Sequence, residues 1–182
     1  HLFFKLSEFR GVLLDWLSEG KEHWRSSVIN FTRNWLKEGL IDRAVTRDLD
    51  WGIEIPREGY EDKRMYVWFE AVMGYYSASV HWAKNQGKPE EWKKWWENED
   101  SEHYYFMAKD NIPFHTIIWP AMLSGCGYKL PYDVPANEYL LLDSSQFSKS
   151  RRHAIWIPDY LDRYDPELLR FYLASIMPEQ KD

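Results

Sequence analysis

Between residues 65 and 142 the chain alternates short apolar runs with longer amphipathic stretches, and this alternation limits its fold more than any other feature. Apolar runs at 66–69, 104–108 and 138–142 predict three strands. The stretches 70–85 and 113–123 between them predict helices. The order strand, helix, strand, helix, strand indicates a parallel sheet with right-handed crossovers, so we predict an α/β fold.

The composition fits a globular chain that is long enough to bury a core. Of its 182 residues, 45% are hydrophobic and 29% are charged. The formal net charge of −6 argues against a surface that grips nucleic acid throughout, although a local basic patch remains compatible with it. Eleven tryptophans indicate that large rings fill gaps between elements.

The single cysteine, Cys126, excludes an intramolecular disulfide and favours a reducing compartment. No apolar run reaches transmembrane length and no signal-peptide pattern is present, so we expect a cytoplasmic location and no membrane partner. The chain begins at His1 and runs directly into Leu2-Phe3-Phe4. We therefore expect it to be a piece of a longer protein.

Helix signals also occur outside the alternating region. Ser7 is a candidate cap for a first helix, and a second is predicted over 27–38, with Gly39 closing it. Asp165-Pro166 predicts a capped helix that continues to Ile176. The expected buried positions are Phe9, Leu13 and Leu17 in the first helix and Val28, Phe31 and Trp35 in the second. The cluster of Trp92, Trp95 and Trp96 is interpreted as surface packing on a charged segment.

Three segments carry residues suited to a ligand site. In the first, Trp68, Ala71 and Tyr75 follow the spacing i, i+3, i+7 and share one helical face. A large ring, a small gap and a phenol on one wall suit a small apolar ligand with a polarisable atom. On periodicity alone, ordinary core packing is the stronger interpretation of these residues.

The second segment directly follows the predicted strand 104–108. Asn111, His115 and Trp119 are spaced i, i+4, i+8, again on one helical face. Asp110, at the strand end, is placed to accept hydrogen bonds from a sugar diol. The competing interpretations are a plain N-cap for Asp110 and a core histidine for His115.

The third segment, Gln146–His153, is a polar loop in which small residues surround Lys149 and precede Arg151 and Arg152. A mobile cationic loop can close on a polyphosphate and neutralise the charge that develops as pyrophosphate leaves. A solvated basic loop is the alternative. No glycine-rich phosphate-binding fingerprint is present.

Taken together, the three segments resemble the methionyl-tRNA synthetase family, of class I. The family's Tyr-Val-Trp-x-(Asp/Glu)-Ala-x-x-Gly-Tyr segment stands almost intact at Tyr66–Tyr75. Its Gly-Lys-Asp-x-x-x-Phe-His-x-x-x-Trp-Pro segment is similar to Ala108–Pro120, and its Lys-Met-Ser-Lys-Ser loop to Gln146–Ser150. The stretch Arg47–Ile53 resembles the same branch of the class. The resemblance covers essentially the whole chain.

The resemblance implies a division into three regions. Residues 1–64 would be the remainder of an inserted α/β connective domain, and residues 65–139 the second half of a Rossmann catalytic domain. Residues 140–182 would hold the Ser-Lys-Ser loop and the start of a helical stem-contact region. The family's His-Ile-Gly-His motif and its zinc-knuckle cysteines are absent from this sequence. We therefore expect no metal site here and no complete adenylation site in these residues.

The resemblance also assigns roles to individual residues. The implied methionine-binding residues are Trp68, Ala71, Val72, Tyr75, Asn111 and His115, with the Tyr75 hydroxyl contacting the thioether. The implied ATP-binding residues are Lys149, Ser148, Asp110, Glu54 and Leu140. Lys149 and Arg47 are the implied catalytic residues. Three departures from the family pattern stand in the loop: Gln146 replaces its first lysine, Phe147 its methionine, and Arg152 a following glycine.

The activity that the resemblance implies is that of a methionine–tRNA ligase. Such an enzyme condenses methionine with ATP, supplied as its Mg²⁺ complex, to methionyl-adenylate and passes the methionyl group to tRNA(Met). Two alternatives remain open. One is a class I synthetase for a branched aliphatic amino acid, which the Trp68/Tyr75/His115 set disfavours. The other is a synthetase-like, non-catalytic module that binds RNA or a protein.

Overall fold

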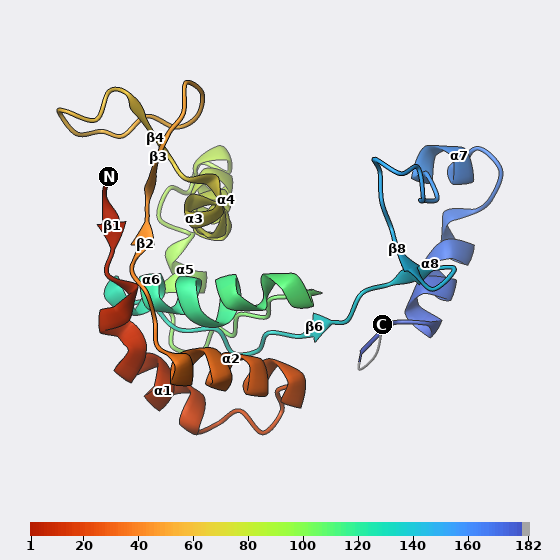
Figure 1. Cartoon of the computed structure of the whole chain (residues 1–182), viewed down its shortest axis with the longest axis horizontal. Coiled ribbons are helices and arrows are strands. Elements are labelled where there is room, and N and C mark those ends of the chain that lie inside the picture. The colour runs from red at the N-terminus through yellow and green to blue at the C-terminus, as the bar shows by residue number, and fades with distance from the viewer. Residues whose placement is uncertain (180–182) are drawn as a thin grey trace.

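The N-terminal part of the chain is a helical layer edged by short strands (Figure 1). In the computed structural model, which describes residues 1–179, this part holds β1 (Phe3–Phe4), the 3-10 turn η1 (Leu6–Phe9), α1 (Arg10–Ser18), α2 (Ser26–Glu38), β2 (Arg43–Ala44) and β3 (Thr46–Asp48). β1 pairs antiparallel with β2, so the chain returns to its own start before it enters β3.

The middle of the chain holds the helices that line the candidate site. Its elements are β4 (Lys63–Met65), α3 (Val67–Glu70), η2 (Ala71–Met73), α4 (Gly74–Asn85), α5 (Lys93–Trp96), β5 (Met107–Ala108), η3 (Lys109–Asn111), the π-turn η4 (Phe114–Ile118), α6 (Trp119–Gly125) and β6 (Ala136–Asn137). β5 and β6 pair in parallel, with a further parallel bridge between Tyr104 and Asp133. Helix α6 makes the crossover between them, which confirms the predicted α/β class.

The C-terminal part lies apart from the rest and is reached through a single extended segment after β6 (Figure 1). It contains β7 (Leu141–Leu142), β8 (Ser145–Gln146), α7 (Ile157–Leu161) and α8 (Pro166–Ser175). The Asp165 side chain accepts a hydrogen bond from the Glu167 amide at the start of α8, which confirms the predicted cap. The last three residues of the predicted 140–182 region lie outside the described residues.

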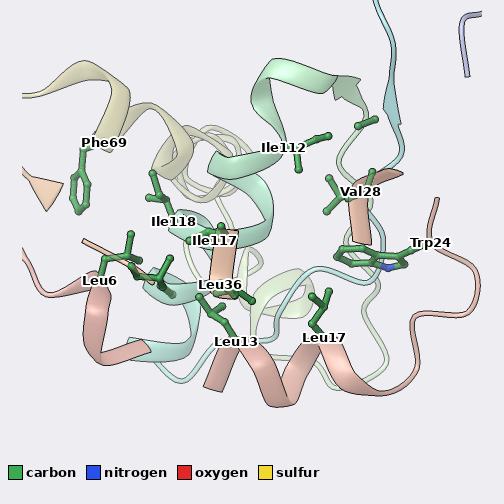
Figure 2. Close-up of a cluster of buried hydrophobic side chains, with 14 residues drawn as sticks. Leu6, Leu13, Leu17, Trp24, Val28, Leu36, Phe69, Ile112, Ile117 and Ile118 are labelled. Atoms are coloured by element: carbon green, nitrogen blue, oxygen red, sulfur yellow. The ribbon is translucent and has the colours of Figure 1, made fainter. Parts of the chain in front are cut away.

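One hydrophobic cluster joins the helices α1 and α2 to the parallel pair (Figure 2). Its N-terminal members are Leu6, Leu13, Leu17, Trp24, Val28, Leu36 and Leu40, and its later members are Phe69, Ile112, Ile117, Ile118, Ala121, Val134 and Ala136. The proposed regions 1–64 and 65–139 therefore share a core. Their boundary at residue 64 stays a prediction about the division of the chain.

The first predicted strand, at 66–69, is wrong. Residues Lys63–Met65 form the strand β4, which pairs antiparallel with β3, and the helix begins directly afterwards at Val67. Four consecutive apolar residues do not distinguish a buried strand from a buried helix. The helical spacing of the buried Phe69 and Val72, with the Phe69 ring 5.5 Å from that of Phe4, selects the helix.

The buried face of α2 also differs from the prediction. Val28, Thr32 and Leu36 are fully buried, whereas Phe31 is 41% exposed and Trp35 only half-buried. The hydroxyls of Thr32 and Thr116 lie 2.9 Å apart, and each also reaches the carbonyl four residues before it. A small polar residue in the interface lets α2 approach the π-turn closely, which rotates the larger rings outward.

Two further predictions are corrected. Trp96 is buried, with its ring nitrogen donating to the Ser79 hydroxyl at 3.0 Å, so it is a core residue and not surface packing. Of the predicted strand 138–142, only Leu141–Leu142 is a strand (β7), and the parallel strand β6 lies before it, at Ala136–Asn137. Asp143 and Ser144 both have positive φ, at 48° and 61°, and form the two-residue turn of a hairpin in which β7 pairs with β8.

Candidate functional site

A hydrogen bond between Tyr75 and His115 is the centre of the candidate site. The Tyr75 hydroxyl lies 2.8 Å from Nε2 of His115, which brings together residues that are 40 positions apart. Tyr75 comes from α4 and His115 from the π-turn η4. Pro120 lacks the N–H that an α-helical ladder would need, and the Trp119 amide bonds five residues back to the Phe114 carbonyl.

The environment of His115 fixes its tautomer. Its Nδ1 lies 2.9 Å from the carbonyl of Asn111, so Nδ1 carries the proton and Nε2 accepts from the Tyr75 hydroxyl. Burial lowers the pKa of His115, while the Asn111 carbonyl opposes that shift, and the imidazole is neutral at pH 7. Burial also raises the pKa of Tyr75, which keeps the phenol protonated. The pair is thus a neutral, oriented hydrogen bond.

Trp68 lies beside this pair without direct ring contact to it among the described residues. Its indole is 55% exposed and packs on Phe114, at 5.8 Å between ring centroids. Phe114 was missed as a site residue, although it stands next to His115 in the segment that the resemblance rests on. These four residues form a row of two contacting pairs, Trp68 on Phe114 and Tyr75 on His115, which are linked by the chain between Phe114 and His115. Both ends of the row are exposed, since Tyr75 is 44% exposed.

The other predicted methionine-binding residues differ in their accessibility. Ala71 is exposed on the same helical segment, as its predicted place on an open wall requires. Val72 is only 5% exposed and packs in a second hydrophobic cluster with Trp96 and Tyr105. Asn111 is half-buried and binds through its backbone to His115 and through its amide to Asp110, at 3.1 Å.

Behind the pair lies a layer of buried rings. Trp119 donates from its ring nitrogen to the Tyr105 hydroxyl at 2.9 Å, and the Tyr105 ring lies 5.0 Å from Tyr75 and 5.5 Å from His115. Burial raises the pKa of Tyr105 to about 12. Trp119, predicted to share a face with His115, is a wall of this layer and not an open surface, since it is only 4% exposed.

An apolar cavity of about 580 Å³ lies on the neighbouring face of the same helical segment. Phe69, Met73 and Tyr76 line it, together with Trp119 and Cys126, whereas Trp68, Tyr75 and His115 do not. The predicted site residues and this cavity are therefore on different faces, separated by the Trp119 ring.

A second cavity, also about 580 Å³, lies at the carboxyl ends of β5 and β6. Met107, Ala108 and the segment 137–140 line it on one side, and Leu173, Ala174, Met177 and Pro178, in and after α8, line it on the other. Leu140 is the predicted ATP-binding residue among them. Ligands of open parallel sheets bind at such strand ends. Asp110 follows β5 in the 3-10 turn η3 and caps no helix with its exposed carboxylate, so the plain N-cap interpretation is wrong.

Arg47 and Glu54 lie on the β3–β4 side. The Arg47 guanidinium stacks over the Tyr66 ring at 4.0 Å, immediately before α3. Glu54 is exposed and its backbone bridges to Arg64. In Figure 1 this hairpin and the C-terminal part, which carries Lys149 and Ser148, lie at opposite ends of the long axis. The structure therefore does not bring the predicted catalytic residue Arg47 and the predicted ATP-binding residue Glu54 together with Lys149 and Ser148.

The Ser-Lys-Ser loop is a tight, exposed turn. The amide of Ser148 donates to the carbonyl of His153 at 2.9 Å, and the reverse bond measures 3.0 Å. Arg152 has φ 55°, the left-handed conformation that favours glycine. Lys149, Gln146 and Phe147 are all exposed. Arg152 thus takes a backbone conformation that favours glycine, and the turn between Ser148 and His153 closes.

Within residues 1–179, no three His, Cys, Asp or Glu side chains gather closely enough to hold a metal ion. None of the helices formed by these residues is long and apolar enough to cross a bilayer.

Parallel strands crossed by a helix, polar side chains at the strand ends and a cationic Ser-Lys-Ser loop beyond them fit the fold of the class I aminoacyl-tRNA synthetases. Comparison with known proteins gives the branch of that class. The chain belongs to the methionyl-tRNA synthetase family, described as tRNA synthetases class I (M), which it matches over residues 1–182.

Relatives with curated names agree with this family. The chain is 58% identical over 183 residues to a methionine–tRNA ligase of Dehalococcoides mccartyi and 55% identical over 184 residues to that of Thermomicrobium roseum. Each alignment covers all of this chain, 33% of the first relative and 31% of the second. The chain therefore spans about a third of the length of the curated relatives it matches.

Solved structures show the same fold. A Mycobacterium tuberculosis methionyl-tRNA synthetase bound by methionyl-adenylate superposes with a TM-score of 0.75 at 24% identity. The superposition covers 94% of this chain and 32% of that one.

Proposed function

We propose that the protein to which these residues belong is a methionine–tRNA ligase. In this reaction the carboxylate of methionine attacks the α-phosphorus of ATP, which yields methionyl-adenylate and pyrophosphate. A hydroxyl of the terminal adenosine of tRNA(Met) then attacks the carbonyl of the adenylate and releases AMP. Family membership and the names of the relatives support this proposal. A cytoplasmic location belongs to the same proposal.

The Tyr75–His115 hydrogen bond is the observation that best supports methionine as the amino-acid substrate. A thioether is polarisable and gains from contact with ring edges and a nearby dipole. The row from Trp68 through Phe114 to Tyr75 offers both, and the neutral imidazole holds the phenol in one orientation. We infer that the methionine side chain lies along this row, with the exposed Ala71 leaving room beside it and Asn111 and Val72 supporting it from behind.

The hydroxyl of Tyr75 has a single hydrogen, and in the structure it is directed at His115. A contact with the thioether then has two forms. The sulfur meets the phenolic oxygen and ring edge, or the hydroxyl turns and gives up its 2.8 Å bond to the imidazole. Either form discriminates sulfur from a methylene group, because only sulfur interacts favourably with the polar pair.

For ATP, the cavity at the ends of β5 and β6 supports a nucleoside site. Its apolar lining suits an adenine ring beside Leu140, and Asp110 follows β5 with an exposed carboxylate suited to a ribose diol. Glu54 is proposed for the same ribose. Mg²⁺ would arrive with the triphosphate as part of the substrate, since residues 1–179 hold no carboxylate cluster for it.

Catalysis by these residues would consist of positioning and charge stabilisation, without a protein nucleophile. Lys149, with Ser148 beside it, would neutralise the charge that develops on the leaving pyrophosphate, and Arg47 would contribute from the β3–β4 side. Because the β3–β4 hairpin and the C-terminal part, which carries the loop, lie at opposite ends of the long axis in Figure 1, the loop would have to approach the strand ends when ATP binds.

The test of this proposal is substrate discrimination in the complete gene product that contains these residues. Methionine is compared with norleucine, which replaces the sulfur by a methylene group, in ATP–pyrophosphate exchange. Tyr75→Phe is expected to reduce the methionine preference by about 1 kcal/mol, roughly fivefold in kcat/KM, as for the loss of one hydrogen bond. Tyr76→Phe is the matched control, because Tyr76 lines the neighbouring cavity, and it should leave the preference unchanged.

Two outcomes would overturn the proposal. One is a complete protein that binds leucine or isoleucine more tightly than methionine, which would indicate a branched-aliphatic synthetase. The other is the absence of exchange with any amino acid, which would indicate a non-catalytic module. Isolated residues 1–182 are expected to show no exchange, because they lack the His-Ile-Gly-His half of the nucleotide site.

A further inference from the structure

Residues in the connection between α1 and α2 bind the segment that leads into β6. Trp24 donates from its ring nitrogen to the Tyr132 carbonyl at 2.7 Å, and His23 reaches the same oxygen at 3.1 Å while its ring stacks on that of Tyr132. Trp24 is also buried in the main hydrophobic cluster (Figure 2). This connection is therefore a fixed support for the chain that enters β6.

Arg25, the next residue in this connection, binds both residues of β6. One guanidinium nitrogen donates to the Ala136 carbonyl at 2.7 Å and to the side-chain oxygen of Asn137. The Arg25 backbone is itself fixed, because its carbonyl accepts bonds from the first turn of α2, from Val28 and Ile29. The guanidinium is thus a rigid fork at the point where the parallel pair ends.

The other end of the fork reaches the C-terminal part. The second guanidinium nitrogen of Arg25 pairs with Glu179 at 3.2 Å, beyond α8. One residue earlier, the Pro178 carbonyl accepts from the Glu138 amide at 2.8 Å. These bonds close a loop that begins at β6, passes through the Ser-Lys-Ser turn and α8, and returns to the same place.

We propose that Arg25 is a positioning residue, which sets the placement of the Ser-Lys-Ser loop relative to the nucleoside cavity by tying β6 to the end of the C-terminal part. The geometry supports this role, because residues 137–140 both line that cavity and lead directly into the hairpin that carries Lys149. The part of the inference that concerns catalysis rests on the proposed adenylation function.

The chemistry of arginine matters at this site. A planar guanidinium can bond the Ala136 carbonyl, the Asn137 amide oxygen and the Glu179 carboxylate at once, whereas a lysine ammonium is a compact charge on a flexible stem. Arg25→Lys therefore keeps the charge but not the fork. If attraction to Glu179 alone were responsible, Arg25→Lys would behave like the wild type.

The kinetic experiment uses the complete gene product. Arg25→Ala and Arg25→Lys are expected to lower kcat for ATP–pyrophosphate exchange by roughly 10- to 100-fold, the range for misplacement of a catalytic group. The dissociation constant for methionine, measured calorimetrically, should change less than about twofold, because the Tyr75–His115 pair is not touched. Arg33→Ala, at an exposed position of the same helix, is the matched control and should change neither value.

The structural experiment does not depend on activity. Amide hydrogen exchange should be faster in residues 138–153 of Arg25→Ala than of the wild type, with unchanged exchange in α1 and α2. Should Arg25→Ala not fold, Glu179→Ala replaces it, since this exposed change removes only the distal acceptor. The inference would be overturned by an unchanged kcat of Arg25→Ala, by wild-type kinetics of Arg25→Lys, or by unchanged amide hydrogen exchange in residues 138–153.

A wild-type protein without ATP–pyrophosphate exchange activity would contradict the proposed function. Amide hydrogen exchange would then still decide whether Arg25 is a positioning residue.

Discussion

Arg152 adopts a left-handed backbone conformation in the closed turn between Ser148 and His153. Its φ of 55° is costly for a residue with a side chain, and glycine adopts it without strain. The sequence alone marks Arg152 as a departure from the family pattern and leaves the path of the loop in doubt. The bonds between Ser148 and His153 show that the turn closes regardless, with the strain carried at one residue.

Relief of that strain is the first prediction. Arg152→Gly should stabilise the closed turn by about 1 kcal/mol, the lower end of the penalty for a left-handed residue with a side chain. The amide of His153, which donates to Ser148, should then exchange roughly fivefold more slowly. Arg151→Gly is the matched control, because Arg151 is not among the positive-φ residues. Equal effects of the two variants would contradict the assignment of strain to Arg152.

The second prediction concerns the pH dependence of His115. In the unfolded chain its imidazole takes up a proton near pH 6.5, whereas burial lowers its pKa in the folded state. Below about pH 6.5 the unfolded state therefore binds more protons than the folded state. The free energy of unfolding decreases as the pH is lowered from about 6.5 to the pKa of the folded state. Protonated Nε2 also cannot accept from Tyr75, so methionine affinity should fall with acidification. Calorimetric titration between pH 5 and 8 measures this.

The control for this prediction is His115→Gln, which cannot titrate. Its methionine affinity should be lower than that of the wild type at pH 7.5 but nearly flat between pH 5 and 8. A wild-type profile as flat as that of the variant would show that the imidazole does not govern binding in this range.

Residue-level prediction from the sequence succeeded where a spacing was short and local. The spacing of Asn111 and His115 predicted that they lie one helical turn apart, and in the structure Nδ1 of His115 bonds to the Asn111 carbonyl four residues before it. Phe114 and Tyr105 were missed, since their roles depend on which rings meet from distant segments. Whether an aromatic side chain points toward the core depends on tertiary packing, which a local sequence pattern does not specify.

At the scale of elements, the phase of α2 gives the third prediction. Leu36→Ala should cost about 2–5 kcal/mol of unfolding free energy, because it leaves a cavity at a fully buried position. Phe31→Ala is the matched control and should cost less than about 1 kcal/mol, because that ring is 41% exposed. Urea denaturation followed by circular dichroism measures both. A larger loss of unfolding free energy in Phe31→Ala than in Leu36→Ala would support the buried face of α2 that was predicted from the sequence.

Element types were predictable from the sequence more often than element boundaries. The helices 26–38 and 166–175 were found from their periodicity and from Gly39 and Asp165, which are local signals. The run at Tyr66–Phe69 was misassigned because a buried helix and a buried strand give the same apolar pattern over four residues. The hairpin at Asp143-Ser144 was missed because Asp-Ser is a much weaker turn signal than Asn-Gly.

At the scale of the whole molecule, burial is unevenly distributed. The main cluster draws on residues from Leu6 to Ala136, and it joins the proposed connective and Rossmann regions into one core. Among the described residues, none from 137 to 179 is fully buried, and Leu168 and Phe171 of α8 are 61% and 77% exposed. The C-terminal part is thus held by the junction at Arg25 and Glu138 and not by a core of its own.

This asymmetry gives the last prediction, for the isolated chain. Removal of residues 140–182 should shift the melting temperature by no more than about 4 °C, because residues 140–179 include no fully buried side chain and their surface ion pair with Arg25 is worth about 1 kcal/mol. Removal of residues 1–19 should abolish cooperative melting, because Leu6, Leu13 and Leu17 each contribute about 2–5 kcal/mol, against a total stability of about 5–15 kcal/mol. Thermal melting followed by circular dichroism compares both pieces with residues 1–182. Loss of the cooperative transition on removal of residues 140–182 would show that the C-terminal part belongs to the core.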